Sequence, residues 1–395
     1  MLLSDIRQLA AERLPATIAD RRHLHAHPEL SFSEKETSVF IKARLDALGI
    51  PWTAIADTGV VGTIEGGQPS DRMVALRADM DALPITELNT VDYISRNNGI
   101  MHACGHDAHT ASLLATAGIL RSLKDRWAGK VRLIFQPAEE KLPGGASLMI
   151  RDGVLENPFP LAVIGQHVMP SVPAGQIAMR GGQLMASMDE ISVAVHGKGG
   201  HGAMPHLLVD PVLISAHLIV ALQQIISRNN NPVTPGVLSF GRVIADGAIN
   251  VIPDTVYLKG TFRTVDEAWR YAAHEKMKKM AEQVVGAMGG SCDFEVVCGY
   301  PSLWNDPRLT AELEDNAVAY LGRSNVVSTE PMMIAEDFAY YGRSAPACFY
   351  FLGTGNAEKG TTAPLHNPRF NIDEEALEVS TGLMAYLAIR QLGNI

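Results

Sequence analysis

The sequence predicts an α/β fold, in which a mostly parallel sheet with helices on its faces is interrupted by a smaller inserted domain. Short apolar, β-branched runs alternate with helical stretches in the first part of the chain, a pattern typical of parallel sheets. The middle of the chain instead follows the order β-α-β-β-α-β, the split βαβ pattern. The length of 395 residues is sufficient for two or three domains.

Four apolar runs are expected to form the buried strands of the main sheet. Each is bounded by Gly, Pro or charged residues, as buried strands usually are. The runs cover residues 73–77, 131–136, 161–165 and, much later in the chain, 348–352. Helical stretches at 110–123 and about 146–152 lie between the first three runs. This alternation predicts parallel strands whose connecting helices cover the faces of the sheet.

The middle of the chain contains two helices and four strands in a different order. The first helix is expected to begin with Asp210 as its N-cap and to run to about residue 228. The second is expected to start at the capping box Thr264-Val265-Asp266-Glu267 and to end at Gly289-Gly290. Strands are expected at 187–195, 237–243, 256–263 and 293–298. This ferredoxin-like insertion covers residues 183–297, so the larger domain comprises residues 1–182 and 298–395.

Composition and charge exclude several classes of function. Acidic residues number 43 and basic residues 33, and the net charge of −10 offers no electrostatic footprint for nucleic acid. The most apolar stretch, 216–226, is short and interrupted by polar residues, so no membrane span is expected. The first residues carry charges and lack the apolar region of a signal peptide. The four cysteines form no C-x-x-C pair and no disulfide framework, which favours a reduced, cytoplasmic setting.

Metal-binding and acid–base side chains follow three successive predicted strands. Asp79 and Asp81 follow the first strand, Glu139 and Glu140 follow the second, and His167 follows the third. Ligands of open α/β sheets bind beyond the carboxyl ends of the strands, so these side chains are expected to meet at one edge. The loop before the helix at residue 110 adds further candidates, namely His102, Cys104, His106, Asp107 and His109.

Two short segments carry the strongest chemical signal. In residues 104–107, Cys-Gly-His-Asp, a thiolate and an imidazole two positions apart can reach one metal cluster. The alternative is a buried cysteine at a helix start, with Asp107 as the N-cap. Glu139 and Glu140 point in different directions, so one can bind metal while the other acts as a general base. The alternative for this pair is a solvated acidic turn.

Other histidines are less informative from their local sequence. His167 could be a hydrogen-bonded core residue, and His366 lies in a rigid loop between two prolines. The run of His23, His25 and His27 is expected to pack against the edge of the sheet rather than to bind metal.

Residues 197–202 match the pattern G-x-G-x-x-G after a strand, but they do not predict a dinucleotide site. A dinucleotide site requires a helix immediately after the glycines, whereas here the next helix is expected to begin only at Asp210. The sequence also lacks a Walker A motif, an H-E-x-x-H motif and a G-x-S-x-G motif.

Taken together, the motifs resemble those of the M20 metallopeptidase family, in its branch of hippurate hydrolases, N-acyl-amino-acid amidohydrolases and plant auxin-conjugate hydrolases. They occur in family order across nearly the whole chain. The matching stretches are Arg22-His23-Leu24-His25, Pro28-Glu29-Leu30, residues 76–84, His102-Ala103-Cys104-Gly105-His106-Asp107, Gln136-Pro137-Ala138-Glu139-Glu140, residues 199–206, Asn250-Val251-Ile252-Pro253, Gly260-Thr261-Phe262-Arg263 and Glu336-Asp337-Phe338.

The resemblance implies a catalytic domain with a dinuclear metal site. The metal ligands implied by similarity are Cys104, His106, Glu140, His167 and His366. Cys104 stands where related peptidases have a bridging aspartate. Glu139 is implied as the general base. Asp79 is expected to orient a ligand histidine or the base, and Asp81 is expected to be structural.

The resemblance also implies a smaller lid domain that often mediates dimerisation, so a homodimer through the lid is expected. His201 resembles a lid histidine that supports the oxyanion, often across the dimer. Asn250 and Arg263 resemble lid residues that hold the substrate carboxylate.

The implied activity is hydrolysis of an N-acyl or N-aroyl amino acid, such as a hippurate-like substrate, to a carboxylic acid and a free amino acid. Two divalent ions per subunit are expected, with Zn²⁺ favoured by the thiolate and imidazole donors and Mn²⁺, Co²⁺ or Ni²⁺ also compatible. Alternatives within the family are a dipeptidase or other exopeptidase and an N-acetyldiaminopimelate-type deacetylase. An alternative of another class is a non-catalytic small-molecule-binding protein on this fold.

Overall fold

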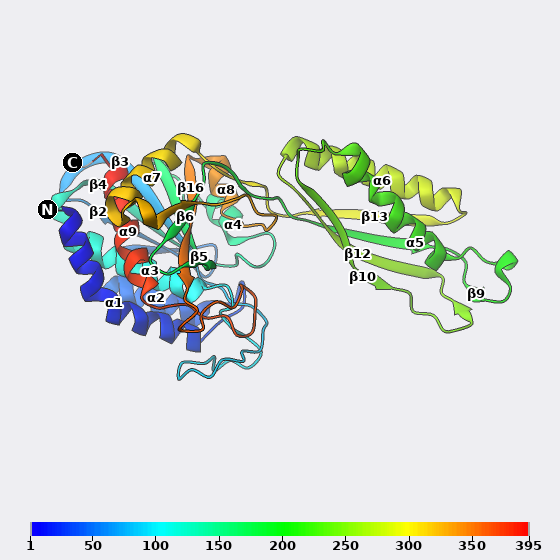
Figure 1. The fold of residues 1–395 in the computed structure, drawn as a ribbon, viewed down its shortest axis with the longest axis horizontal. Helices are drawn as coiled ribbons and strands as arrows, with labels where there is room; N and C mark the ends of the chain where they lie inside the picture. The colour runs from blue at the N-terminus through cyan, green and yellow to red at the C-terminus, as the bar shows by residue number, and fades with distance from the viewer. Residues whose placement is uncertain (1, 394–395) are drawn as a thin grey trace. The chain divides into compact units, whose positions relative to one another are not determined.

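The computed structural model describes residues 2–393, which form two compact units (Figure 1). The first, here called the core unit, takes its residues from Met1–Gly182, Trp304–Glu330 and Asp337–Ile395. The second, here called the inserted unit, comprises Gln183–Leu303 and Pro331–Glu336.

An eight-stranded sheet forms the centre of the core unit, and its four middle strands, β4, β3, β5 and β16, run parallel. The strand order is β1-β2-β4-β3-β5-β16-β6-β15. The four predicted runs fall on these middle strands, which confirms the mainly parallel sheet. The strands are β1 (Trp52–Ile55), β2 (Gly59–Glu65), β3 (Gln68–Asp79), β4 (Ala128–Gln136), β5 (Ala162–Pro173), β6 (Ile177–Met179), β15 (Val326–Ser328) and β16 (Ala347–Gly355).

Helices cover both faces of this sheet, with α3 and α9 on one face and the short helices α4 and α8 on the other (Figure 1). Helix α3 is buried almost all round, because it lies between the sheet and the helices α1 and α9. The helices are α1 (Leu2–Ala26), α2 (Lys35–Ala47), α3 (His106–Ser122), α4 (Gly145–Arg151), α7 (Pro307–Leu321), α8 (Ala339–Ser344) and α9 (Ala376–Gln391). This packing holds the carboxyl ends of the middle strands in fixed positions.

The inserted unit follows the predicted order β-α-β-β-α-β. Its elements are β8 (Asp189–His196), α5 (Pro211–Leu222), β10 (Gly236–Ile244), β12 (Thr255–Thr264), α6 (Glu267–Ala287) and β13 (Ser291–Cys298). The strands form an antiparallel sheet in the order β10-β12-β8-β13, and α5 and α6 lie side by side on one of its faces (Figure 1). Residues 191, 193 and 195 of β8 point into the core beneath the helices, and the alternate residues lie on the open face.

Two helix boundaries in the inserted unit differ from the prediction. Helix α6 begins at Glu267, because Asp266 is the N-cap and accepts a hydrogen bond from the Trp269 N–H. Thr264 is instead the last residue of β12, where it pairs with Gly236. Helix α5 ends at Leu222, and a π-helical turn covers Ile225–Asn229.

Short strands escaped prediction because they are only two to four residues long. β9 (Gly200–His201) and β11 (Val251–Ile252) pair as a ribbon, and so do β7 (Gly182–Met185) and β14 (Leu303–Asn305). Within residues 2–393 one stretch, Pro211–Asn229, passes a membrane-span test by length and composition alone. Its buried side chains, among them Ile214 and Leu218, pack into the core of the inserted unit.

Candidate metal centre

Strands β3, β4 and β5 bring the candidate residues to one level of the sheet. Asp79 pairs with Gln136, and Arg77, two residues earlier on β3, pairs with Gly165. Asp79 is the last residue of β3, and His167 lies within β5 rather than beyond its end as predicted. His167 is therefore held by the sheet itself, level with Asp79.

Two groups of three potential ligands share Cys104. The ligand atoms of Cys104, His106 and His167 lie within 4.8 Å of one another, and so do those of Cys104, Glu140 and His366. The structure thus brings together all five residues that the resemblance implies as ligands. A single thiolate common to two triads is the arrangement expected of a bridging ligand between two cations.

Hydrogen bonds leave one nitrogen of each candidate histidine facing this cluster. His167 donates from Nδ1 to the carbonyl of Val168 at 2.7 Å, so its Nε2 faces Cys104 Sγ at 3.3 Å. His106 uses Nδ1 toward Asp81 at 3.1 Å, and its buried Nε2 has no hydrogen-bond partner. A buried imidazole nitrogen without a partner, on a residue grouped with Cys104 and Glu140, fits a metal ligand.

His366 is placed by the same loop that carries Cys104. Its N–H donates to the carbonyl of Ala103 at 2.8 Å, and its backbone has a positive φ of 62°. Its Nε2 lies 3.2 Å from Oε1 of Glu140. Its side chain is half exposed, so His366 lies at the open side of the cluster.

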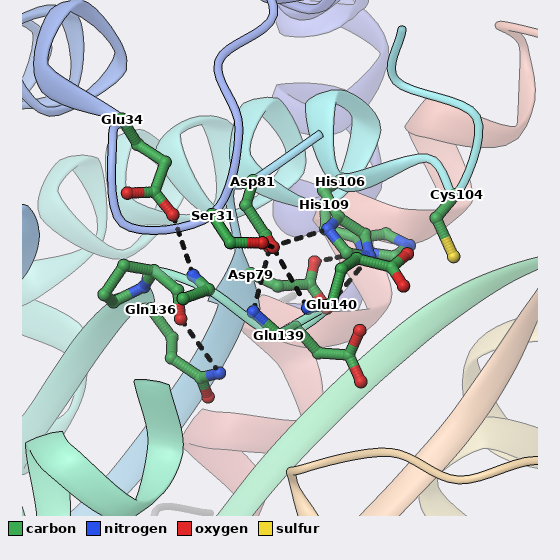
Figure 2. Close-up of polar contacts among 12 residues, drawn as sticks. Ser31, Glu34, Asp79, Asp81, Cys104, His106, His109, Gln136, Glu139 and Glu140 are labelled. Carbon is green, nitrogen blue, oxygen red and sulfur yellow. Dashed lines mark hydrogen bonds and ion pairs between the residues drawn. The ribbon is translucent and has the colours of Figure 1, made fainter. Parts of the chain in front are cut away.

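Two buried carboxylates hold three consecutive N–H groups of the loop that carries Glu139 and Glu140 (Figure 2). Glu34 accepts from the N–H of Ala138 at 2.8 Å. Asp81 accepts from Glu139 at 3.0 Å with one oxygen and from Glu140 at 3.0 Å with the other. The loop that presents the proposed base and a proposed ligand is therefore fixed through its backbone.

Asp81 contacts more of the site than its expected structural role implied. It bonds His106, accepts the two N–H groups just described and accepts the Ser31 hydroxyl at 2.6 Å. Asp79, which was expected to orient a ligand histidine or the base, bonds His109 Nδ1 at 2.6 Å. Its other oxygen bonds Arg77 at 2.6 Å and lies 3.6 Å from His106 Nε2. Asp81, rather than Asp79, makes the orienting hydrogen bond to His106.

His109 belongs to the same histidine-rich segment but is fully engaged elsewhere. Its Nδ1 bonds Asp79, and its Nε2 accepts from the Val168 N–H at 2.8 Å. His25, near the N-terminus, is buried between Asp107 at 2.8 Å and Glu87 at 3.1 Å. Neither histidine has a nitrogen free for a cation.

The electrostatics of the cluster favour bound cations. Burial and then the carboxylates of Glu140 and Glu139 raise the pKa of the Cys104 thiol well above its usual value. Burial alone would lower the pKa of His106, but Asp79 and Asp81 outweigh it and raise this pKa to about 10. Such a site has excess negative charge, which divalent cations neutralise while they stabilise the thiolate. The thiolate, imidazole and carboxylate donors therefore fit two divalent metal ions.

The candidate substrate-binding residues lie on the inserted unit. His201, on β9, is exposed, and its Nδ1 accepts from the Ala203 N–H at 3.1 Å. Asn250 lies beside it, since its carbonyl accepts from the Gly202 N–H at 2.9 Å. Arg263, on β12, is half-buried and donates to the carbonyl of Met333 at 3.2 Å.

Within the inserted unit, Arg263 lies far from His201 and Asn250. The β9–β11 ribbon lies beyond the Thr255 end of β12 (Figure 1). Arg263 is eight residues further along that strand. At about 3.3 Å per residue, the Cα atoms of Thr255 and Arg263 are roughly 26 Å apart along the strand. Arg263 and Asn250 of one inserted unit therefore cannot hold the same carboxylate.

Comparisons with known proteins place the chain in one family of hydrolases. The model of peptidase family M20/M25/M40 matches residues 75–390. The chain is 43% identical to an N-acyl-L-amino acid amidohydrolase of Geobacillus stearothermophilus, over 78% of this chain and 84% of that protein. It is 41% identical to thermostable carboxypeptidase 2 of Saccharolobus solfataricus, over 94% of each. The crystal structure of Bacillus subtilis YxeP, described as a dinuclear metal-binding peptidase, superposes with a TM-score of 0.83 at 36% identity, covering 98% of this chain and 100% of that one.

Proposed function

The chain belongs to peptidase family M20/M25/M40 and is a metal-dependent amidohydrolase, and from this premise we propose that it cleaves N-acyl or N-aroyl amino acids to a carboxylic acid and a free amino acid. The observation that carries the proposal is the pair of ligand triads that share Cys104, with the Glu139 carboxylate close to His106 and Glu140. The amidohydrolase relative, at 43% identity, supports the substrate class.

Cys104, His106, Glu140, His167 and His366 would hold the two cations. When bound, the cations would lower the pKa of the attacking water and polarise the substrate carbonyl. Glu139 is buried and its backbone N–H is held by Asp81, and its carboxylate lies beside His106 and Glu140 in the cluster. It takes the proton from the water and returns it to the leaving nitrogen.

Arg263 holds the substrate carboxylate in this proposal. It lies on the helix-free face of the inserted sheet, in a groove of about 490 Å³. Arg242 and Lys259 also line this groove, together with serine and threonine hydroxyls and the single carboxylate of Glu190. A groove with this excess of positive charge suits an anionic group, and a guanidinium can bind a carboxylate in a bidentate way.

His201 supplies a hydrogen bond to the developing oxyanion in this proposal, and Asn250 lies beside it. Loss of one such donor typically lowers the rate about 10²- to 10³-fold. Because Arg263 and Asn250 lie at opposite ends of β12, we assign them to different copies at each active site. His201 and Asn250 of one subunit then serve the site that uses Arg263 of the other.

A homodimer through the inserted unit supplies this second copy. Leu213 and Val220 lie seven residues apart and therefore on the same side of helix α5, with 53% and 72% of their surfaces exposed. Strand β10 is an edge of its sheet and exposes Val243 and Ile244. Exposed apolar side chains and an open strand edge support an association surface.

Zinc is the proposed metal, because thiolate and imidazole donors favour it, while Mn²⁺, Co²⁺ and Ni²⁺ are compatible with Glu140. We propose a cytoplasmic location, because Cys104, Cys292, Cys298 and Cys348 are all free, as is usual in a reducing compartment. The carboxypeptidase relative supports a second candidate, an exopeptidase acting on small peptides with the same centre.

The test is amine release from a panel of N-acyl amino acids by chelator-stripped enzyme, before and after Zn²⁺ or Mn²⁺ is restored. The panel contains N-benzoylglycine, N-acetylmethionine, N-acetyldiaminopimelate, indole-3-acetylalanine and a plain dipeptide. Metal-dependent cleavage of the acyl or aroyl substrates is the expected result. Cleavage of the dipeptide alone would favour the exopeptidase, and no turnover by folded, metal-loaded enzyme would contradict both.

A further inference from the structure

The Glu336-Asp337-Phe338 motif has no part in the mechanism so far, yet its aspartate is completely buried at a junction of three elements. Asp337 Oδ1 accepts from Arg77 Nη2 on β3 at 2.8 Å. Both of its oxygens accept from Gln136 Nε2 on β4 at 2.8 Å. Its Oδ2 also accepts from the N–H of Ala146, in the first turn of α4, at 3.0 Å.

The backbone of the same residue reaches the proposed general base. The N–H of Asp337 donates to Oε1 of Glu139 at 3.4 Å, a long hydrogen bond that can tighten when substrate is bound. The side-chain oxygens of Asp337 are already surrounded by donors, so they are not available as metal ligands. We propose that Asp337 is a positioning residue, whose anchored side chain holds its own N–H against the Glu139 carboxylate; this inference rests on the proposed function.

The polarity of the network explains why an aspartate is needed here. Gln136 Oε1 accepts from Arg77 Nε at 2.9 Å, which turns its Nε2 toward Asp337. Every group that faces the Asp337 side chain in these four bonds is therefore a donor. An asparagine would have to direct its own NH₂ group at two of these donors in either orientation, which leaves buried donors without an acceptor.

This arrangement makes a specific prediction for the base. An N–H group that donates to a carboxylate fixes the direction in which that carboxylate points. If Asp337 shifts, Glu139 loses this orienting contact. The expected signature is a lower kcat with a nearly unchanged KM, because the base is misplaced while substrate binding is kept.

The first variant is D337N, assayed with the substrate that the panel identifies. We expect kcat to fall at least tenfold with KM within about twofold, while the metal content measured by mass spectrometry is unchanged. The matched control is D189N in the inserted unit. Asp189 is also completely buried and accepts from Arg270, His274 and the Gly299 N–H, but it belongs to a different unit from the base. This control is expected to lower stability while kcat at a temperature where the protein stays folded remains within about twofold of the wild type.

In the second variant, Q136E/D337N, the carboxylate moves to position 136 and the amide moves to position 337. The new carboxylate at position 136 would accept from Arg77 and from the new amide at position 337, and one negative charge would remain beside Arg77. We expect the double variant to recover part of the lost kcat, because a hydrogen bond to the new carboxylate at position 136 replaces one of the two donor–donor contacts of D337N. Recovery would also show that the D337N loss does not arise from misfolding.

Three outcomes would overturn the inference. They are a D337N enzyme with the wild-type kcat, a D337N enzyme that loses metal, and a double variant that folds and binds metal but recovers nothing. An inactive wild-type enzyme would instead contradict the proposed function, so the two failures are distinguishable.

Discussion

His106 and Asp81 are joined by a hydrogen bond of 3.1 Å between Nδ1 and Oδ1, and both side chains are completely buried. The bond leaves the other ring nitrogen, Nε2, buried without a hydrogen-bond partner, in a ring that lies close to Cys104 and the glutamates. The same aspartate also holds the backbone of Glu139 and Glu140. A proposed ligand and the loop with the proposed base are therefore coupled through one carboxylate.

Replacing Asp81 by Asn should weaken metal binding. The amide can accept from fewer of the four donors that surround Asp81, so His106 and the loop both lose support. Loss of such an outer contact typically costs about 10- to 100-fold in metal affinity. Competition with a coloured chelator measures the metal affinity of each variant. Ser31→Ala removes only one of the four donors and is the control, and equal affinity in both variants would contradict the coupling.

Glu139→Gln and its neighbour Glu140→Gln should separate the two carboxylate roles. Glu139→Gln should keep both metal ions and lose about 10²- to 10⁴-fold in kcat, because an amide cannot accept the proton. Glu140→Gln should lose metal instead. Metal content and steady-state kinetics on the same samples measure both effects. Near-normal turnover of Glu139→Gln would remove it from the role of base.

Glu34 should act through its hydrogen-bond geometry rather than its charge. One oxygen accepts from the N–H groups of Phe32 and Ala138, and the other accepts from the Thr58 hydroxyl. Burial and then the charge of Asp81 already raise the pKa of Glu34. Glu34→Gln can keep all three contacts, because its amide can donate to the Thr58 oxygen, and it should stay within a few-fold of wild-type kcat.

The comparison variant is Glu34→Ala, which leaves the N–H of Ala138 without its acceptor. We expect kcat to fall at least tenfold in this variant, since the loop that carries Glu139 loses one of its three anchors. Steady-state kinetics with both variants at equal metal loading measure the difference. Similar activities for the Gln and Ala variants would show that Glu34 does not position the loop.

Local signals in the sequence mark four of the candidate residues, whereas the roles of His167 and His366 as ligands were expected only from the resemblance to the family. Cys104 and His106 lie in one short motif, and Glu139 and Glu140 directly follow an apolar run. The anchoring contacts had no such signal. Asp81 binds N–H groups 58 and 59 positions away, and Glu34 binds one that is 104 positions away. These pairings depend on how strands and loops meet, although the Asp-x-Asp spacing at 79 and 81 does place both side chains on one side of the chain.

Local competition explains the misplaced start of helix α6. The segment 264–267 offers two caps, Thr264 and Asp266, and the sequence alone favoured the capping box that begins at Thr264. The cross-strand pairing of Thr264 with Gly236 keeps it in β12, so Asp266 becomes the cap. A long-range pairing thus overrides a local preference. The same holds for His167, which was expected beyond the end of a strand but lies within β5 because that strand continues to Pro173.

The buried ion-pair network at His25 should make stability depend on pH. Burial and Arg21 alone would lower the pKa of His25, but Asp107 and Glu87 outweigh them, so its pKa is raised. Its stabilising contribution is therefore complete below the unfolded value of about 6.5 and is lost as pH rises through the folded value. Arg21 and His25 hold the pKa of Asp107 well below its usual value despite burial, so Asp107 stays ionised throughout this range.

The measurement is the difference in thermal midpoint between wild type and His25→Asn from pH 5.5 to pH 9, with metal present. We expect the difference to be largest at the acidic end and to shrink as pH rises. His23 provides a control of opposite sign, because burial and then His27 lower its pKa. The difference between wild type and His23→Asn should grow as pH rises from 5 to 7.5. A His25→Asn difference that does not change with pH would mean that His25 has the same pKa in the folded and the unfolded protein, which would contradict a stabilising ion pair with Asp107 and Glu87. A difference that grows with pH would mean that His25 is neutral in the folded protein.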